Sequence, residues 1–277
     1  MAHISAFADE VVEDFPGQIE FLASQKVRYI EPRFLGGRNI MDLRPAELKD
    51  ARKLMRDHGI KPSAIGSPIG KVRIDEPFGP HLDRFKHAVE LADFFDAPFI
   101  RMFSYYPPEG KDIADFRGEV MDRMAAKVEI VEDTGIVMVH ENEAHIYGHS
   151  AANCVDLVNT IDSACLRLVY DPANFVWGEK ITNPIEVCWP LMKPYVVHIH
   201  IKDWKLGADI GSIPGEGDGQ IRELLAELAA MSYKGCMTME PHLKVGGQFG
   251  GSTGPDLFAR AIDAVRRLAD EVGLECN

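Results

Sequence analysis

The chain of 277 residues has few cysteines, and their arrangement excludes two classes of small protein. Its five cysteines are scattered, and no two of them form a Cys-x-x-Cys pair. An odd, scattered set argues against a disulfide framework and against a thiolate zinc site. We therefore expect a protein of a reducing compartment, the cytoplasm.

Long apolar runs and an excess of basic residues are also missing. No apolar segment approaches the length of a membrane span, and the opening MAHISAFADE lacks the features of a secretory signal. The formal net charge is −13, which disfavours nucleic acid or an anionic membrane as a partner. What is present is a globular composition, 46% hydrophobic and 26% charged, which supplies a sizeable core.

Nucleotide-binding loops are absent as well. The pattern G-x-x-x-x-G-K-[ST] does not occur, and the first predicted strand runs into FADEVVEDFPG (7–17). This segment is acidic and contains a single glycine, whereas a dinucleotide fingerprint needs several glycines to cradle phosphates. We therefore expect no nucleotide cofactor at this turn.

Short β-type runs alternate with longer amphipathic segments along the whole chain. Such alternation predicts parallel strands covered by helices, and eight repeats of roughly 30 residues predict a (β/α)₈ TIM barrel. We expect residues 1–277 to form one α/β domain of this kind, with a doubly wound open sheet as the alternative. The predicted strands are His3–Phe7, Tyr29–Glu31, Pro62–Ile65, Phe99–Met102, Ile136–Glu141, Leu166–Asp171, Val196–Ile201 and Cys236–Glu240. Helical patterns cover 44–59, 81–96, 113–135, 221–231 and 255–273.

Four consecutive predicted strands offer a metal-capable side chain near their carboxyl ends. These are Glu141, Asp171, His200 and Glu240, at intervals of 30, 29 and 40 residues. Catalytic residues of a TIM barrel lie at this end of the strands, so we expect the four to meet. Three carboxylates and one imidazole suit Mn²⁺, Mg²⁺ or Co²⁺ better than a structural zinc.

Two of these residues, Asp171 and His200, also have an ordinary structural interpretation, whereas glutamate is a poor helix cap and a poor strand residue. Asp171 precedes Pro172 and is typical of a helix N-cap, and a lone strand histidine is usually a core residue.

Glu143 has the same strand parity as Glu141 and is a rival for the ligand position. We prefer Glu141 because it ends the strand. Independent caps would not need to fall on four successive strands, so the coincidence favours a metal site.

The strand VVHIHIKDW (196–204) places three polar residues on one face. Residues two apart in a strand point the same way, so His198, His200 and Lys202 share a direction. His200 is nearer the rim and is the better ligand. His198 either supports it or is a hydrogen-bonded core histidine, and Lys202 either binds a substrate oxygen or extends to solvent.

Further candidates lie at the rim. Glu31 and Arg101 stand at strand ends and are candidates for substrate binding, as is His145 in the loop after the fifth strand. Two glycine-rich loops, 214–221 and 244–254, can fold over the site; the first can equally be a turn before a helix. Other residues at or after strand ends are Phe7, Arg33 and Ser67.

The sequence resembles the sugar isomerase/epimerase superfamily with the xylose-isomerase-like TIM barrel. The resemblance spans essentially the whole chain and is carried by VHENEAHIYG (139–148), YDPANF (170–175), HIHIKDW (198–204), IPGEGDG (213–219) and MEPH (239–242). It implies that Glu141, Asp171, His200 and Glu240 bind a divalent ion, often manganese. It also implies that Glu141 and Glu240 act as acid and base on a carbohydrate, in a protein that is often a dimer or tetramer.

One residue departs from the pattern of the sugar 3-epimerases, which carry Asp-x-x-His after the sixth strand. Here the motif is Asp171-Pro-Ala-Asn174, and Asn174 can bind a hydroxyl but cannot carry a proton. We expect an isomerase or epimerase that works through a metal-stabilised enediolate. The alternative is a lyase or dehydratase acting on a keto-sugar, an inosose or a 3-keto glycoside. Less favoured are an enzyme like endonuclease IV and a non-catalytic sugar-binding barrel.

Overall fold

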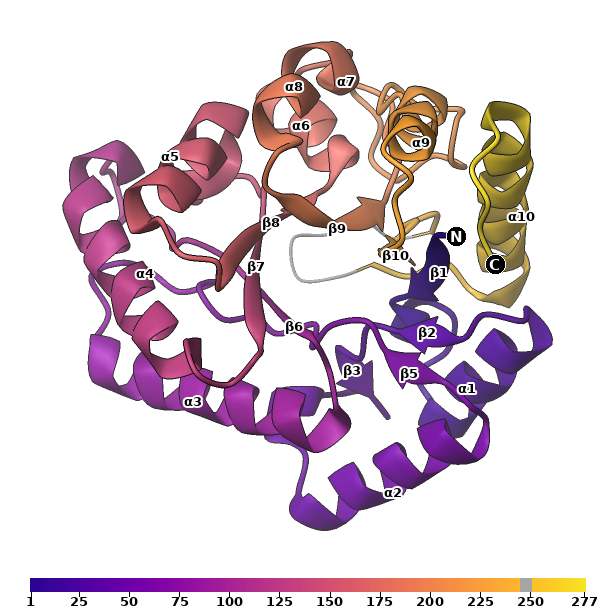
Figure 1. Cartoon of the computed structure of the whole chain (residues 1–277), viewed down its shortest axis with the longest axis horizontal. Coiled ribbons are helices and arrows are strands. Elements are labelled where there is room, and N and C mark those ends of the chain that lie inside the picture. The colour runs from indigo at the N-terminus through magenta and orange to yellow at the C-terminus, as the bar shows by residue number, and fades with distance from the viewer. Residues whose placement is uncertain (245–250) are drawn as a thin grey trace.

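The computed structural model describes residues 1–244 and 251–277 and shows a ring of parallel strands enclosed by helices (Figure 1). Six strands form one continuous parallel sheet in the order β1-β10-β9-β8-β7-β6. Their bounds are β1 (His3–Ala6), β6 (Phe99–Met102), β7 (Val137–Glu141), β8 (Leu166–Tyr170), β9 (Val196–Ile201) and β10 (Cys236–Met239). The predicted TIM barrel is therefore confirmed.

The ring is completed by a separate two-stranded pair, β2 (Tyr29–Ile30) and β5 (Lys61–Pro62). The amide of Glu31 donates to the carbonyl of Ala6 at 2.9 Å, and the amide of Arg101 donates to the carbonyl of Ile65 at 3.0 Å. The amide of Ile65 also donates to the carbonyl of Phe99 at 2.8 Å, so residues just beyond β2 and β5 join the pair to β1 and β6. Both strands are shorter than predicted, and Pro62 has no N–H to extend the ladder.

The five predicted helices are present with shifted ends, and others were not predicted. Residues 113–135 divide into a 3₁₀ turn and α4, and α3 begins three residues earlier than expected. The helix bounds are α1 (Phe15–Ser24), α2 (Pro45–Asp57), α3 (Phe78–Phe95), α4 (Arg117–Val131), α5 (Ala151–Ile161), α6 (Pro172–Glu179), α7 (Pro184–Val187), α8 (Trp189–Met192), α9 (Ile221–Ala230) and α10 (Pro255–Val272). The 3₁₀ turns are η1 (Ala8–Glu10), η2 (Ile40–Asp42), η3 (Ile113–Phe116) and η4 (Tyr147–His149), and a small antiparallel hairpin joins β3 (Phe34–Leu35) to β4 (Arg38–Asn39).

Alternating side chains of the strands divide the molecule into an apolar layer and a polar barrel interior. On β9 and β10, Ile199 and Met237 belong to the apolar core between sheet and helices. The intervening His200 and Thr238 instead make polar contacts with Glu31 inside the barrel. Because successive side chains of a strand point to opposite faces, one face of each strand packs in the apolar core and the other contributes to the polar site.

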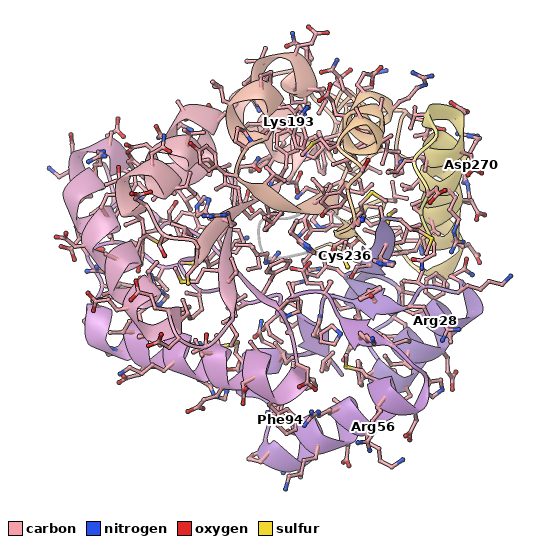
Figure 2. The ribbon with its side chains drawn as sticks, in the orientation of Figure 1. Arg28, Arg56, Phe94, Lys193, Cys236 and Asp270 are labelled. Atoms are coloured by element: carbon pink, nitrogen blue, oxygen red, sulfur yellow. The ribbon has the colours of Figure 1, made fainter. Side chains whose placement is uncertain are left out.

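Charged side chains such as Arg56, Lys193 and Asp270 lie in the outer layer, away from the strand ring (Figure 2). Within residues 1–244 and 251–277, none of the helices combines the length and the apolar character that crossing a bilayer requires. Both observations agree with the absence of long apolar runs in the sequence.

His81 on α3 provides a pH-dependent contribution to stability. Its Nε2 accepts from the amide of Gly70 at 3.2 Å, and burial, aided by Lys127 and Arg123, lowers its pKa to about 3. The unfolded chain takes up this proton near pH 6.5, so the contribution is complete above pH 6.5 and declines as the pH falls toward 3. We expect His81→Gln to reduce the pH slope of the unfolding free energy by about 1.4 kcal/mol per pH unit between pH 6 and 4. Urea unfolding at several pH values measures this; parallel slopes for both proteins would contradict it.

Candidate active site

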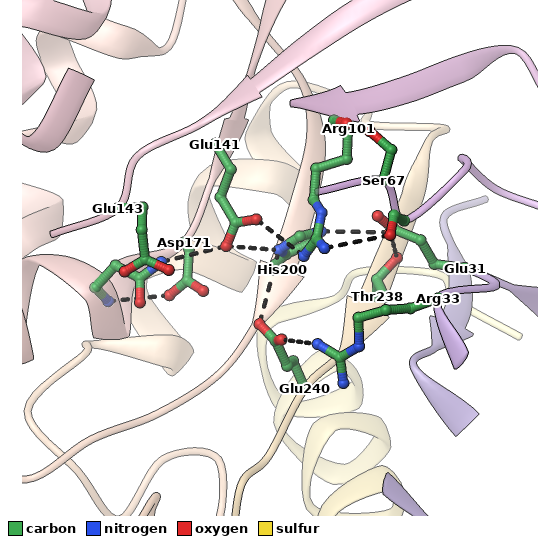
Figure 3. A network of polar contacts seen from close by, with 12 residues as sticks. Glu31, Arg33, Ser67, Arg101, Glu141, Glu143, Asp171, His200, Thr238 and Glu240 are labelled. Carbon is green, nitrogen blue, oxygen red and sulfur yellow. Dashed lines mark hydrogen bonds and ion pairs between the residues drawn. The ribbon is translucent and has the colours of Figure 1, made fainter. Parts of the chain in front are cut away.

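Four buried metal-capable side chains meet at the carboxyl ends of β7 to β10 (Figure 3). Glu141 ends β7, Asp171 follows β8, His200 lies within β9, and Glu240 follows β10. One potential ligand atom from each lies within 4.8 Å of the others. We call these four residues the ligand quartet; they lie together as the strand-end pattern predicts.

The strand register explains why residues so far apart in sequence meet. Glu141 is paired with Val169 on β8, two residues before Asp171, and His200 is paired with Thr238 on β10, two residues before Glu240. Neighbouring parallel strands therefore end at one level. Since side chains two apart share a face, the four point toward the same space.

Asp171 has two functions that use different oxygens. Its Oδ1 accepts from the amide of Asn174 at 3.1 Å and caps α6, as a residue before Pro172 is predicted to do. Its Oδ2 lies 2.8 Å from the ammonium of Lys202. Burial raises the pKa of Asp171 to about 6, although Lys202 opposes the shift.

Glu141 is held by three neighbours. Its Oε2 accepts from Arg101 at 3.2 Å, while its Oε1 accepts from the Asn174 amide at 3.2 Å and lies 3.2 Å from Nδ1 of His200. Burial alone would raise the pKa of Glu141, but His200 and Arg101 bring it to about 2. The carboxylate is therefore ionised and oriented.

Glu240 is held in the same way on the opposite side of the quartet. Arg33 donates to its Oε1 at 2.6 Å, and Lys202 donates to its Oε2 at 3.2 Å. His242 lies 3.4 Å from Oε1. Burial opposes ionisation, yet Lys202, His242 and Arg33 hold the pKa of Glu240 well below its ordinary value.

His200 is oriented by a carboxylate beneath it. Its Nε2 lies 3.3 Å from Oε2 of Glu31, and the same oxygen contacts His198 at 2.8 Å and the Thr238 hydroxyl at 2.9 Å. Its Nδ1 faces Glu141 at 3.2 Å and Glu240 at 4.0 Å. A carboxylate on the far nitrogen is the usual support of a metal-binding histidine.

The donor set and its charge fit a divalent metal ion. Burial disfavours a charged imidazole, but Glu141 and Glu31 raise the pKa of His200 to about 10, so the surrounding field favours positive charge. Among the described residues, Nδ1 of His200 and Oδ2 of Asp171 have no hydrogen bond of good geometry. Carboxyl groups outnumber Lys and Arg by seven to four in this polar network: Asp9, Glu10, Glu31, Glu141, Glu143, Asp171 and Glu240 against Arg33, Lys71, Arg101 and Lys202.

Comparison with known proteins identifies the family. Residues 19–268 match the family described as "Xylose isomerase-like TIM barrel". The chain belongs to this family. Fructoselysine 3-epimerase of Shigella flexneri is 22% identical over 217 residues, covering 72% of this chain and 74% of that protein.

Solved structures share the architecture. D-psicose 3-epimerase from Clostridium cellulolyticum H10, solved with D-tagatose, superposes with a TM-score of 0.75 at 16% identity over 100% of both chains. A xylose isomerase-like TIM barrel protein from Mycobacterium smegmatis, in complex with magnesium, gives a TM-score of 0.75 at 14% identity, covering 98% of this chain and 97% of that chain. At such identities the likeness establishes the fold.

Within this xylose isomerase-like barrel, the residues predicted to bind substrate fall into two groups. Arg101, Lys202 and Asn174 contact the quartet directly. Glu31 lies one layer deeper, against both histidines. His145 is exposed and stacks edge-on to Trp177 with 6.2 Å between ring centroids, outside the quartet.

Glu143, the rival of Glu141, faces a different partner. Its Oε2 accepts from Lys71 at 3.1 Å, and its Oε1 accepts from the amide of Ala144 at 2.9 Å. Lys71 also lies over the ring of Phe103, 4.3 Å from the centroid. Glu143 therefore forms a buried ion pair beside the quartet. The sequence alone did not decide between Glu141 and Glu143 for the ligand position.

The first glycine-rich loop wraps around a residue that sequence reasoning did not select. The Asp203 carboxylate accepts from the amides of Gly215 and Gly217 at 2.8 and 2.9 Å through Oδ2, and from Gly219 at 2.9 Å through Oδ1. The loop is therefore clamped to the end of β9 and leads into α9. An aspartate two residues after the end of a strand, with alternating glycines at 215, 217 and 219 in the loop that follows, is the signal that was available.

The second glycine-rich loop, 244–254, lies largely outside the described residues. Its described end is tied to Glu10, whose Oε2 accepts from the Thr253 hydroxyl at 2.7 Å and from the amide of His242 at 2.9 Å. Glu10, His242 and Asp9 were not selected from the sequence. Asp9 pairs with Arg33, 24 residues away, and Glu10 accepts from His242 and Thr253, 232 and 243 residues away. These contacts are set by the fold, although His242 itself lies within the MEPH motif, two residues after Glu240.

Removing the carboxylate beneath His200 tests its supporting function. Glu31→Gln keeps the shape but loses the charge that holds the imidazole in place. We expect Mn²⁺ to bind the variant about 10- to 100-fold more weakly, as is typical when such a support is lost. Isothermal titration calorimetry measures the dissociation constant. An unchanged dissociation constant would show that Glu31 contributes to the fold but not to metal binding.

Proposed function

We propose that this xylose isomerase-like protein is a divalent-metal-dependent sugar epimerase or isomerase. The observation that carries the proposal is the placement of Glu141 and Glu240. They come from β7 and from the end of β10, and each reaches the same His200 nitrogen, at 3.2 and 4.0 Å. Two carboxylates that approach one position from different strands can remove and return a proton on a bound sugar.

The chain's own residues supply the proton transfer and the orientation. A divalent ion in the quartet, for which manganese is favoured, would polarise the substrate carbonyl and favour loss of the adjacent proton. One of Glu141 and Glu240 removes that proton as a carboxylate, and the other returns a proton that it has taken up from solvent; the proton removed leaves the first glutamate to solvent. Arg101 and Asn174 hold the first carboxylate, and Arg33 holds the second through Oε1, so neither needs to reorient during turnover.

The names of the relatives support a keto-sugar substrate. The curated relative acts on fructoselysine, and the superposable enzyme from Clostridium cellulolyticum H10 was solved with D-tagatose. Both names describe ketoses that are epimerised at carbon 3. We therefore propose a ketose, free or substituted, as the substrate of this chain.

Deuterium exchange tests the proposal directly. The Mn²⁺-loaded protein is incubated in D₂O with a panel of ketoses, inososes and 3-keto glycosides, and the products are followed by NMR. We expect deuterium to enter one carbon next to the carbonyl of at least one ketose, with formation of its epimer or isomer. Absence of exchange across the panel would contradict the proposed reaction.

A second candidate rests on Asn174. Its side chain donates to Glu141 at 3.2 Å and to the carbonyl of Asn142 at 2.8 Å, so it cannot relay a proton. Where reprotonation is slow, the same proton abstraction ends in loss of a β-substituent, which is the outcome of a lyase or dehydratase. The NMR experiment separates the two, because elimination produces new olefinic or enone signals in place of a deuterated epimer.

We also propose that the protein works in the cytoplasm and forms a dimer or tetramer. All five cysteines are unpaired in the structure, as a reducing compartment requires. Light scattering coupled to size exclusion measures the assembly, and a monomeric mass would contradict the second part.

A further inference from the structure

Lys202 places a buried ammonium group inside the ligand quartet. It follows β9 on the same side as His200, and its side chain is 7% exposed. Its Nζ lies 2.8 Å from Oδ2 of Asp171 and 3.2 Å from Oε2 of Glu240. A positive charge thus already bridges two of the four proposed ligands.

The two oxygens that Lys202 contacts are the ones still open for a metal ion. Oδ1 of Asp171 is used to cap α6, which leaves Oδ2. Oε1 of Glu240 is used by Arg33 at 2.6 Å, which leaves Oε2, the oxygen nearer His200. A divalent ion bound by Asp171 and Glu240 must therefore share both remaining oxygens with the ammonium.

The two arginines at the site do not compete in this way. Arg33 contacts Oε1 of Glu240, and Arg101 contacts Oε2 of Glu141. In both cases the other oxygen of the carboxylate faces His200. These guanidinium groups orient the ligands from outside, whereas the ammonium of Lys202 lies on the inner side.

We propose that Lys202 is an internal cation that competes with the divalent ion for Asp171 and Glu240. The ammonium holds these carboxylates in place, and the ion must displace it to bind. Because lysine is a point charge on a flexible stem, this displacement needs only side-chain rotation. Lys202 thereby keeps metal affinity low and the ion exchangeable. The inference rests on the metal site of the proposed function.

Lys202→Met tests the competition, because methionine keeps the length of the side chain and removes the charge. Lys71→Met is the matched control: it also removes a buried ammonium at this rim, but one whose partner is Glu143, outside the quartet. Lys202→Gln is a second neutral variant that retains a hydrogen-bond donor for Asp171, so the test does not depend on one variant folding. Mn²⁺ binding is measured by calorimetry on chelator-treated protein.

We expect Lys202→Met and Lys202→Gln to bind Mn²⁺ about 10- to 100-fold more tightly than the natural chain, since a like charge within a few ångströms of the ion is removed. Lys71→Met should change the dissociation constant by less than about 3-fold, since its ammonium pairs with Glu143, which is not a member of the quartet. Mn²⁺ should also raise the melting temperature of the Lys202 variants more than that of the natural chain.

Three other results would overturn the inference, and they are distinguishable. If the natural chain binds Mn²⁺ and the Lys202 variants bind it equally or more weakly, the lysine supports the metal and only this inference fails. If neither the natural chain nor any variant binds Mn²⁺, the metal site of the proposed function fails as well. Tightening of similar size in Lys71→Met would show a general charge effect and would likewise overturn the specific competition.

Discussion

Glu141→Gln and Glu240→Gln are each expected to lower turnover by about 1,000-fold, because an amide cannot accept the proton that the carboxylate removes. Both glutamates are buried and contact the His200 imidazole, so neither is easily replaced by water or by a neighbouring base. Glutamine keeps an oxygen that can still bind a metal ion. The substrate panel that identifies the reaction also supplies the assay for both variants.

The two glutamine variants should block different steps of the reaction. The variant that lacks the base loses deuterium exchange at the substrate carbon, whereas the variant that lacks the acid keeps exchange from one face but loses the epimer. Glu143→Gln is the control, because this residue pairs with Lys71 and lies outside the quartet; its turnover should fall by less than about 10-fold. If both quartet variants keep full turnover with Mn²⁺ still bound, Glu141 and Glu240 are not the acid and the base.

Asp203→Ala is expected to lower the free energy of unfolding by about 3–4 kcal/mol, because it leaves several backbone amides without an acceptor. The carboxylate accepts from three glycine amides and, through Oδ1, from its neighbour Trp204 at 2.9 Å. The loop cannot simply close on the alanine. A methyl group cannot accept a hydrogen bond, so the four amides that this carboxylate serves lose their acceptor.

Asp218→Ala is the matched control in the same loop. Its carboxylate accepts a single amide, that of Leu206 at 2.8 Å, and it is only half-buried. We expect it to cost about 1 kcal/mol or less. Urea unfolding monitored by circular dichroism measures both variants, and similar small losses in the two would show that the loop does not depend on Asp203. Because Asp203 follows Lys202 directly, its alanine variant should also weaken turnover.

Much of the barrel and the quartet is predictable from the sequence because both follow from periodicity. A strand that ends on Glu141 and a strand that ends before Asp171 are recognisable one at a time. Parallel pairing then brings their carboxyl ends to one rim regardless of what lies between them. The parity of His198, His200 and Lys202 is likewise a property of any strand.

The sequence predicts less well the function of a residue whose partners are far away in the chain. Glu31 ends a predicted strand and looked like a substrate contact, but its partners are His198, 167 residues away, and Thr238, 207 residues away. Glu10 was not selected for the same reason, since its partners His242 and Thr253 are 232 and 243 residues away. Contacts between strands that are far apart in sequence arise only when the ring closes.

The sequence by itself determined the α/β barrel class and which four strand ends carry metal-capable groups, because strand period and repeat length are local properties. Only the tertiary structure decided how each carboxylate uses its two oxygens. One oxygen of Asp171 caps α6 and the other meets Lys202, and one oxygen of Glu240 meets Arg33 while the other faces His200. Those choices depend on side-chain rotamers packed by neighbouring strands, which no stretch of sequence specifies alone.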